Sequence, residues 1–130
     1  MSKEDLFYSE ERDTRVKDTA EVFTPDWLIQ EMLDRMDIDW SNPPQDKTFL
    51  DPTCGSGNFL VALAKRNIPI NMIYGVDLME DNVKTTKERL IKIYGDTKEN
   101  RKILDEHIRV EDALTYDYSF NDNTGFNLIF

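Results

Sequence analysis

The feature that most constrains the fold of this chain is a glycine-containing turn between a strand and a helix. The turn reads Asp51-Pro52-Thr53-Cys54-Gly55-Ser56-Gly57-Asn58-Phe59. It follows a short apolar strand predicted at residues 48–51, and the apolar residues Phe59, Leu60 and Leu63 then recur at helical spacing. Glycine permits positive φ angles and close approach of the backbone, and amides at a helix start can face a carboxylate or a phosphate. The turn therefore predicts a cradle for a cofactor, although an ordinary tight turn would read the same way in isolation.

Strand and helix signals alternate on both sides of this turn. Further strands are predicted at residues 72–77, 108–110 and 126–130. Helices are predicted to begin at Thr24-Pro25, with Thr24 as the cap, and at Asp81, with Gly95 as the stop, and a shorter helix is expected at residues 100–106. Repeated β-α-β units form parallel sheets with right-handed crossovers. We therefore predict an α/β fold, an incomplete Rossmann-like doubly wound parallel sheet of about four strands with helices on both faces.

Length, charge and cysteine content limit what the chain can do. It has 130 residues and a formal net charge of −10, so we expect one domain at residues 21–130, preceded by a polar arm at residues 1–20. A chain this acidic is a poor free-standing DNA binder, because phosphate contacts need a patch of Lys or Arg. A single cysteine excludes a Cys-based zinc cluster, and no metal site is expected. The charged first residues and the lack of a long apolar run predict a cytoplasmic protein with no membrane partner.

Acidic residues follow three of the predicted strands. Asp51 closes the first strand and can accept a hydrogen bond from the ammonium group of an amino-acid-like ligand. Asp77 closes the second, in Gly75-Val76-Asp77-Leu78, at the distance from the glycine turn from which an acid reaches a ribose diol. Asp112, in Asp112-Ala113-Leu114, follows the third and can accept from the amino group of adenine. The carboxyl ends of parallel strands share an edge, so the three acids are expected in one crevice. Taken singly, Asp77 could cap a helix and Asp112 could be an exposed loop acid.

Several other residues invite a chemical role but fit a simpler one. Leu60 stands where a dinucleotide-binding fingerprint has its third glycine, which disfavours a nicotinamide or flavin cofactor. Cys54 is expected to be a small loop residue, because no motif brings the single histidine, His107, near it. His107 itself is expected at a surface strand edge. Trp27 and the methionines at helical spacing are expected in the core.

The glycine turn, preceded by Val22-Phe23-Thr24-Pro25, resembles the N-6 adenine DNA methylases of restriction-modification systems and phages over about residues 21–130. The resemblance implies S-adenosyl-L-methionine as the cofactor and adenine in DNA as the methyl acceptor. It implies that Phe23 and Thr24 lie beside the methionine end of the cofactor and that the turn, residues 51–59, binds its methionine part. Asp77 then binds the ribose, while Leu78 packs on the adenine that Asp112, Ala113 and Leu114 bind.

The resemblance also implies a catalytic motif that these 130 residues do not contain. Family members continue from a strand like residues 126–130 into Asn/Asp-Pro-Pro-Tyr/Phe, which holds the target amino group and stacks on the flipped base. Asn42-Pro43-Pro44-Gln45 precedes the glycine turn and lacks the aromatic residue, so a proline-rich loop is expected there. We therefore expect no catalytic residue in this chain and no methylation by it alone. DNA would be bound only through a further region or a second chain.

Two classes of function stay open on the sequence. The first is the amino-terminal portion of an adenine-specific DNA methyltransferase, as a truncated frame or as one piece of a split enzyme. The second is a non-catalytic protein that binds S-adenosylmethionine or docks onto a methylase, which the absent tetrapeptide and the acidic charge favour. A glutamine or RNA methyltransferase is disfavoured by Phe23-Thr24-Pro25. The apolar strand from Phe126 to Phe130 predicts self-association or a partner polypeptide at that edge.

Overall fold

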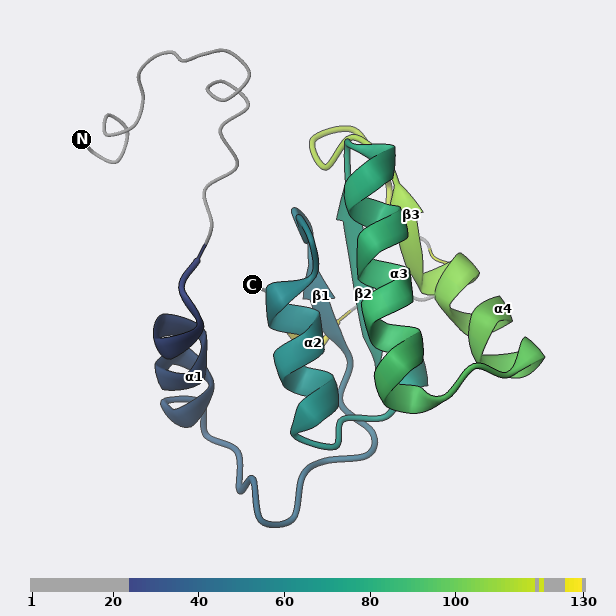
Figure 1. The fold of residues 1–130 in the computed structure, drawn as a ribbon. Coiled ribbons are helices and arrows are strands. Elements are labelled where there is room, and N and C mark those ends of the chain that lie inside the picture. Colours follow the sequence, from purple (N-terminus) through teal and green to yellow (C-terminus); the bar gives the residue numbers. More distant parts are fainter. Residues whose placement is uncertain (1–23, 119, 121–125, 130) are drawn as a thin grey trace.

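A computed structural model of the chain describes residues 24–118, 120 and 126–129 (Figure 1). The predicted polar arm at residues 1–20 lies outside these residues. No helix in the described part of the chain is long and apolar enough to cross a membrane. The elements in chain order are α1 (Asp26–Asp34), β1 (Phe49–Asp51), α2 (Asn58–Lys65), the 3-10 helix η1 (Ile70–Met72), β2 (Ile73–Asp77), α3 (Glu80–Tyr94), α4 (Lys98–His107), β3 (Ile108–Val110) and β4 (Leu128–Ile129).

The strands form one parallel sheet in the order β3-β2-β1-β4 (Figure 1). The chain steps from β1 to β2 to β3 in one direction and then returns past β1 to place β4 on its other side. In open α/β sheets the ligand crevice lies at such a switch point, outside the carboxyl ends of the strands. The predicted α/β class with an incomplete Rossmann-like sheet is confirmed. The last predicted strand is shorter than expected in the described residues, and Phe130 lies outside them.

One face of the sheet carries the helices. Phe49 of β1, Ile73 of β2 and Ile108 of β3 are fully buried in the core cluster that also contains the apolar residues of α2 and α3. The helix α1 packs beside α2, where the Arg66 guanidinium lies 2.9 Å from the carboxylate of Asp34. Figure 1 shows that α1 and α2 both begin at the end of the sheet where β1 turns into α2. The starts of two helices therefore lie at the carboxyl edge of the strands.

The opposite face of the sheet carries an aromatic layer. Leu50, Tyr74 and Val76 point to this side, because side chains alternate along a strand. The Tyr74 ring packs edge-on against Phe120 and Phe126, with ring centroids 5.1 and 4.9 Å apart. A right-handed return from β3 past β1 runs on the side away from α2 and α3, and the described aromatic residues between β3 and β4 pack on this face. In the described part of the chain the helices therefore cover one face, whereas the sequence predicted them on both.

Two helix starts differ from the sequence prediction. Pro25, and not Thr24, is the residue before α1. Its carbonyl accepts hydrogen bonds from the Leu28 and Ile29 amides at 3.0 and 3.1 Å. The residue before α3 is Met79, and among the described residues no side chain caps the helix as was predicted for Asp81. Asp77 accepts the amide of Met79 itself at 2.8 Å. Asp81 lies in the first turn of α3, where its charge suits the helix dipole. Gly95 ends α3 as predicted, with a φ of 114°.

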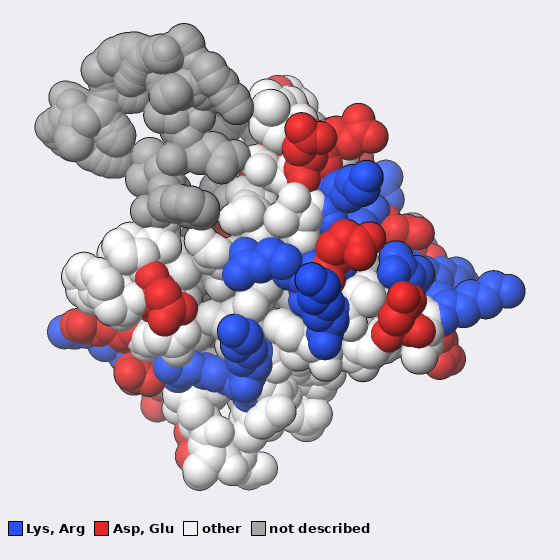
Figure 2. Space-filling model, in the orientation of Figure 1, with Lys and Arg blue, Asp and Glu red and all other residues white. Residues whose placement is uncertain are grey.

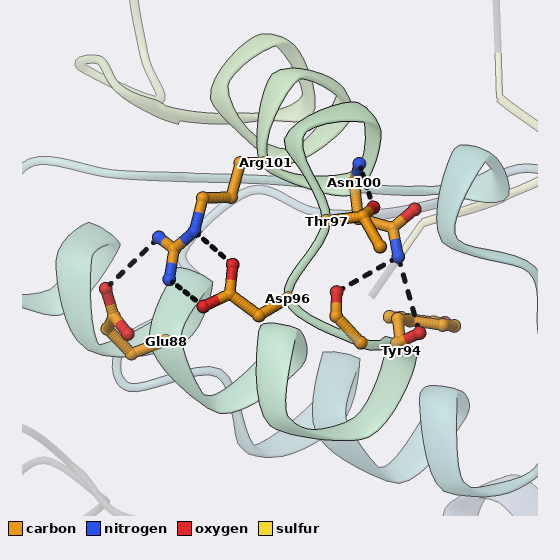
Figure 3. Close-up of polar contacts among 7 residues, drawn as sticks. Glu88, Tyr94, Asp96, Thr97, Asn100 and Arg101 are labelled. Carbon is orange, nitrogen blue, oxygen red and sulfur yellow. Dashed lines mark hydrogen bonds and ion pairs between the residues drawn. The ribbon is translucent and has the colours of Figure 1, made fainter.

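The predicted short helix at residues 100–106 is the ten-residue helix α4. The Thr97 hydroxyl caps it by accepting the Asn100 amide at 3.0 Å, and the Asn100 side chain donates to two carbonyls at the end of α3 (Figure 3). Arg101 pairs with Asp96 at 2.6 Å and with Glu88 of α3 at 3.6 Å. These contacts fix the corner between α3 and α4, so α4 starts earlier than the apolar pattern alone indicates.

The prediction that Trp27 lies in the core is wrong. Its side chain is 67% exposed, because Ile29 and Leu33 occupy the buried side of α1. Met32 on the same helix is also exposed. Five apolar residues within seven positions cannot all face one sheet, so a helix of this length leaves some of them in solvent.

We expect Leu33→Ala to lower the free energy of unfolding by about 2 to 5 kcal/mol, because Leu33 is fully buried and its truncation leaves a cavity. Trp27→Ala is the matched control on the same helix, and we expect it to change that free energy by less than about 0.5 kcal/mol. Urea denaturation of the two variants measures both values. A loss of several kcal/mol in the tryptophan variant would mean that the exposed position of Trp27 is wrong.

Candidate functional site

Three acidic residues lie along the carboxyl edge of the sheet. Asp51 pairs with Gly75 in the register of β1 and β2, which puts Asp77 two residues further along the same edge. Asp77 pairs with Val110 of β3, so Asp112 follows two residues beyond that level. The register therefore arranges the acids in a stepped row along this edge, next to the turn into α2. Asp51 is buried, Asp77 is half-buried and Asp112 is exposed, so the row runs from the core to the surface.

Asp51 is an acid in an apolar environment. It is 5% exposed, and of the described residues only Thr53 donates a hydrogen bond to it, through its amide at 3.2 Å. Loss of water raises the pKa of the Asp51 carboxyl to about 6, the Thr53 amide lowers it, and the nearby charge of Asp77 raises it further. A buried carboxylate with so little support is stabilised by a positively charged group next to it. This position is therefore suited to a cationic ligand.

The glycine turn has the backbone geometry that its sequence predicted. Gly55 has a φ of 55° and Gly57 a φ of 92°, and the Gly57 amide donates to the Cys54 carbonyl at 2.8 Å. A Cβ at Gly57 would lie 2.8 Å from the Thr86 hydroxyl, so only glycine fits against α3 there. A Cβ at Gly55 would meet no heavy atom within 4 Å. One glycine is thus required by packing, and the other borders open space beside Asp51 and Asp77.

Two residues of α3 hold this turn, and the sequence did not single them out. The hydroxyl of Thr86, which is fully buried, donates to the Gly55 carbonyl at 3.0 Å. The Arg89 guanidinium donates to the Ser56 carbonyl and to the Asn58 side-chain oxygen, both at 2.8 Å. Thr86 and Arg89 are three residues apart and so lie on one face of the helix. The spacing of these two residues was the sequence signal that could have identified them. The mixed charges of residues 84–92, however, predict a helix face that is exposed to solvent.

Asp77 is the junction between the turn, β2 and α3. One of its carboxylate oxygens accepts the Gly55 amide at 2.9 Å. The other accepts the Met79 amide at 2.8 Å and the Asn82 side-chain amide at 3.1 Å. A carboxylate has about four acceptor positions, so these three bonds leave about one for a ligand. The position can take one ribose hydroxyl as it stands, and a two-point contact with a diol requires one of the present bonds to open.

The remaining sequence-predicted residues differ in how they are placed. Leu78 and Leu114, at the ends of β2 and β3, expose 69% and 94% of their surface, so both are accessible to a flat ligand. Asp112 accepts the Leu114 amide at 3.0 Å and starts a turn, while Ala113 packs with the aromatic layer of the far face. Thr24 is half-buried just before α1, and Phe23 lies outside the described residues.

Pro52, Thr53, Ser56 and Phe59 are partly exposed or exposed within the turn and the first residues of α2, as a ligand-facing loop requires. The proline-rich segment Asn42-Pro43-Pro44-Gln45 lies at the other edge of the sheet. It precedes β1, and its Gln45 side chain donates to backbone carbonyls of the same loop at 3.1 and 3.3 Å. The structure therefore agrees with its interpretation as a loop.

Cys54 and His107 have structural surroundings. Burial raises the pKa of the Cys54 thiol to about 12, which keeps it protonated and unreactive near neutral pH. His107 is half-buried at the end of α4 and not at a surface strand edge as predicted. Its ring stacks on Tyr74 with centroids 4.0 Å apart, and burial lowers its pKa. No group of three or more metal-ligating side chains occurs among the described residues.

Figure 2 shows Lys and Arg side chains spread over the helical face of the molecule, with Asp and Glu among them. Several of these cations are paired with acids, including Lys87 with Asp105 at 3.1 Å and Arg101 with Asp96 at 2.6 Å. A cation paired in this way contributes little to the attraction of a phosphate backbone.

Comparison with known proteins decides the family. The family model described as N-6 DNA Methylase matches residues 7–129, which is most of the chain. The chain belongs to the N-6 DNA methylase family. The matched range spans the glycine turn, the three strand-end acids and Thr24.

Individual relatives of this methylase chain are methyltransferases by name. It is 31% identical over 124 residues to the Type II methyltransferase M.VspI of Vibrio sp. (strain 343), a match that covers 95% of the chain and 27% of that protein. It is 31% identical over 101 residues to the 2-phytyl-1,4-naphtoquinone methyltransferase of Trichormus variabilis, over 75% of the chain and 40% of that protein. The corresponding protein of Nostoc punctiforme is 36% identical over 72 residues. The chain thus spans well under half the length of these relatives.

We expect Asp51→Asn to raise the free energy of unfolding by about 1 to 3 kcal/mol at pH 7 in the absence of any ligand. The pKa of Asp51 is higher in the folded than in the unfolded chain, so its ionisation above pH 6 favours unfolding. The stability difference between variant and wild type should therefore shrink as the pH falls from about 6 to about 4. Thermal denaturation at several pH values measures it, and a variant that is less stable at every pH would contradict the burial of an ionised Asp51.

Proposed function

We propose that this chain binds S-adenosylmethionine and forms the cofactor-binding portion of an adenine-N6 DNA methyltransferase of the restriction-modification or phage type. The observation that carries the proposal is the buried Asp51 carboxylate next to the glycine turn, at the switch point of the sheet. S-adenosylmethionine has an ammonium and a sulfonium group, and both are cations. A ligand of this charge relieves the unfavourable burial of Asp51 and its repulsion with Asp77.

The other parts of the site fit the rest of that molecule. The start of α2 follows the turn, and amides at a helix start favour a carboxylate such as that of the methionine part. Gly55 borders open space, so a ligand can approach its backbone closely. Asp77 retains about one acceptor position for a ribose hydroxyl. Leu78 and Leu114 are apolar side chains in solvent, and packing on an adenine ring would cover them.

The residues of this chain would bind and align the methyl donor. When bound, S-adenosylmethionine supplies an electrophilic methyl group, so the protein needs little acid-base chemistry and mainly positions the donor. Asp51 and the turn hold the amino-acid end, and Asp77 holds the ribose. Burial of Asp51 keeps water from competing for its charge. We assign no catalytic residue to this chain.

The relatives support this division of roles. A DNA methyltransferase and two naphthoquinone methyltransferases are named among them, and these proteins differ in the methyl acceptor. A segment that is similar to both kinds of enzyme is expected to serve the function that they share, which is the binding of the methyl donor. The family match and the likeness to M.VspI support adenine in DNA as the proposed acceptor, and DNA would be held by residues outside this segment. A cytoplasmic location is part of the same proposal.

A second candidate is a protein that binds the cofactor and docks onto another polypeptide. The observation that favours it is the edge strand β4, on which Ile129 is 63% exposed. An exposed apolar edge of a parallel sheet can pair with a further strand, from a second copy of the chain or from a partner. Both candidates use the same cofactor site.

We expect S-adenosylmethionine to release heat on binding to the wild-type chain, and Asp77→Ala to weaken binding by about ten- to hundredfold, because a hydrogen bond to a charged group is lost. Gly57→Val should abolish binding, since its side chain would collide with Thr86. Asp81→Ala removes an exposed acid from the first turn of α3 and serves as the control. Isothermal titration calorimetry measures all four proteins, and equal affinities throughout would remove the site assignment.

We also expect the affinity for S-adenosylmethionine to fall about tenfold between pH 7 and pH 5, because Asp51 must be ionised to accept a cation and its pKa is about 6. The ligand itself does not titrate in this range. Asp51→Asn should bind weakly at both values with no such pH dependence. The same pH dependence in the asparagine variant would show that another group is responsible.

A further inference from the structure

We infer that Arg89 and Thr86 of α3 are positioning residues that set the glycine turn for the amino-acid end of the cofactor. The inference rests on the proposed binding of S-adenosylmethionine and adds two residues and a mechanism to it. Both side chains contact the backbone of the turn and come from a helix that follows it by about thirty residues. They lie outside the turn, the strand-end acids and the segment before α1.

Thr86 helps to hold the Gly55 peptide in place. The Gly55 amide donates to Asp77 at 2.9 Å and its carbonyl accepts from Thr86 at 3.0 Å, so the residue is held from both sides. Thr86 is fully buried, and its side chain also fills the space that a Cβ at Gly57 would need. The hydroxyl therefore acts where the backbone has the positive φ angles that most residues avoid. Without it, the Gly55 carbonyl would keep only the weak donor of the Cys54 thiol, 3.7 Å away, among the described residues.

Arg89 contacts the glycine turn and the start of α2. The same guanidinium nitrogen donates to the Ser56 carbonyl and to the Asn58 side chain, each at 2.8 Å. Gly55 and Ser56 thus both have their carbonyls turned toward α3. In a trans peptide the N–H points opposite to the C=O, so a Gly55 carbonyl fixed toward α3 turns the Ser56 amide to the other side, where a ligand carboxylate can accept it. The next amide, that of Gly57, already donates to the Cys54 carbonyl.

Arg89 also brings a positive charge to the turn. Arg89 is half-buried, and none of the described acidic side chains forms an ion pair with it. Its positive charge therefore adds to the positive end of the α2 dipole within the first turn of that helix. Both favour an anion at the turn, and S-adenosylmethionine carries one only in its amino-acid part. Removal of Arg89 should consequently weaken contacts to the amino-acid end and spare contacts to the adenosine end.

Calorimetry with two ligands tests this inference on the full chain. S-adenosylmethionine contains the amino-acid end, whereas 5′-deoxy-5′-methylthioadenosine contains the nucleoside without it. We expect Arg89→Met to weaken binding of the first about tenfold and to leave binding of the second unchanged within about twofold. Arg89→Lys, which keeps the charge and one donor, should recover most of the loss. Lys87→Met is the matched control, because it removes one positive charge from the same helix at a residue that pairs with Asp105 of α4.

Thr86 provides a second, independent pair of variants. Thr86→Val keeps the shape and removes the donor, and we expect it to weaken S-adenosylmethionine about tenfold, while Thr86→Ser keeps the donor and should bind like the wild type. If Arg89→Met does not fold, this pair and Arg89→Lys decide the matter. Unchanged affinity in both Arg89→Met and Thr86→Val, or an equal loss for the two ligands, would overturn the inference. No binding of S-adenosylmethionine by the wild-type chain would instead overturn the proposed function, and with it the inference.

Discussion

The carboxylate of Asp77 is the contact on which the arrangement of this edge of the molecule depends. It ends β2, accepts the Gly55 amide of the turn after β1, and accepts the Met79 amide and the Asn82 side chain at the start of α3. One side chain thus joins two neighbouring strands to the helix that follows. Because α3 in turn holds the turn through Thr86 and Arg89, the turn is fixed from both sides before any ligand arrives. Such preorganisation lowers the entropy cost of binding.

In the proposed site, Asp51 is the residue that would select a ligand by charge. Its carboxyl lies in the core, with one amide donor among the described residues and the charge of Asp77 nearby, and these surroundings raise its pKa to about 6. An acid so placed destabilises the folded chain at neutral pH, and a cation at the turn removes that penalty. Local stability and binding are therefore opposed at this residue, which is common where a side chain serves a ligand.

The fold and the placement of the glycine turn and the strand-end acids could be predicted because local signals carry them. Glycines at Gly55 and Gly57, apolar strands and acids at strand ends are adjacent in sequence, and a parallel sheet brings the strand ends together. The contacts of Thr86 and Arg89 with the turn could not be predicted. Polar residues on a helix of mixed charge are expected in solvent, and only the packing of α3 on the turn shows otherwise. The aromatic layer was missed for a related reason: Tyr116, Tyr118 and Phe120 alternate with polar residues but lie in no strand of the described chain, and only the packing on the sheet shows that they cover a face. The predicted cap Asp81 lies instead in the first turn of α3, because the helix already begins at Glu80.

Membership of the N-6 DNA methylase family agrees with our proposal that this segment binds a methyl donor, in which the buried acid beside the turn is the central residue. Titration of the Asp51 side-chain carboxyl carbon by carbon-13 NMR, without and with saturating S-adenosylmethionine, is the most direct test. We expect a pKa of about 6 in the free chain and a clearly lower value in the complex, because the bound cation stabilises the ionised form. An ordinary pKa in the free chain, or a raised pKa that S-adenosylmethionine leaves unchanged, would contradict the cation-binding role of this residue.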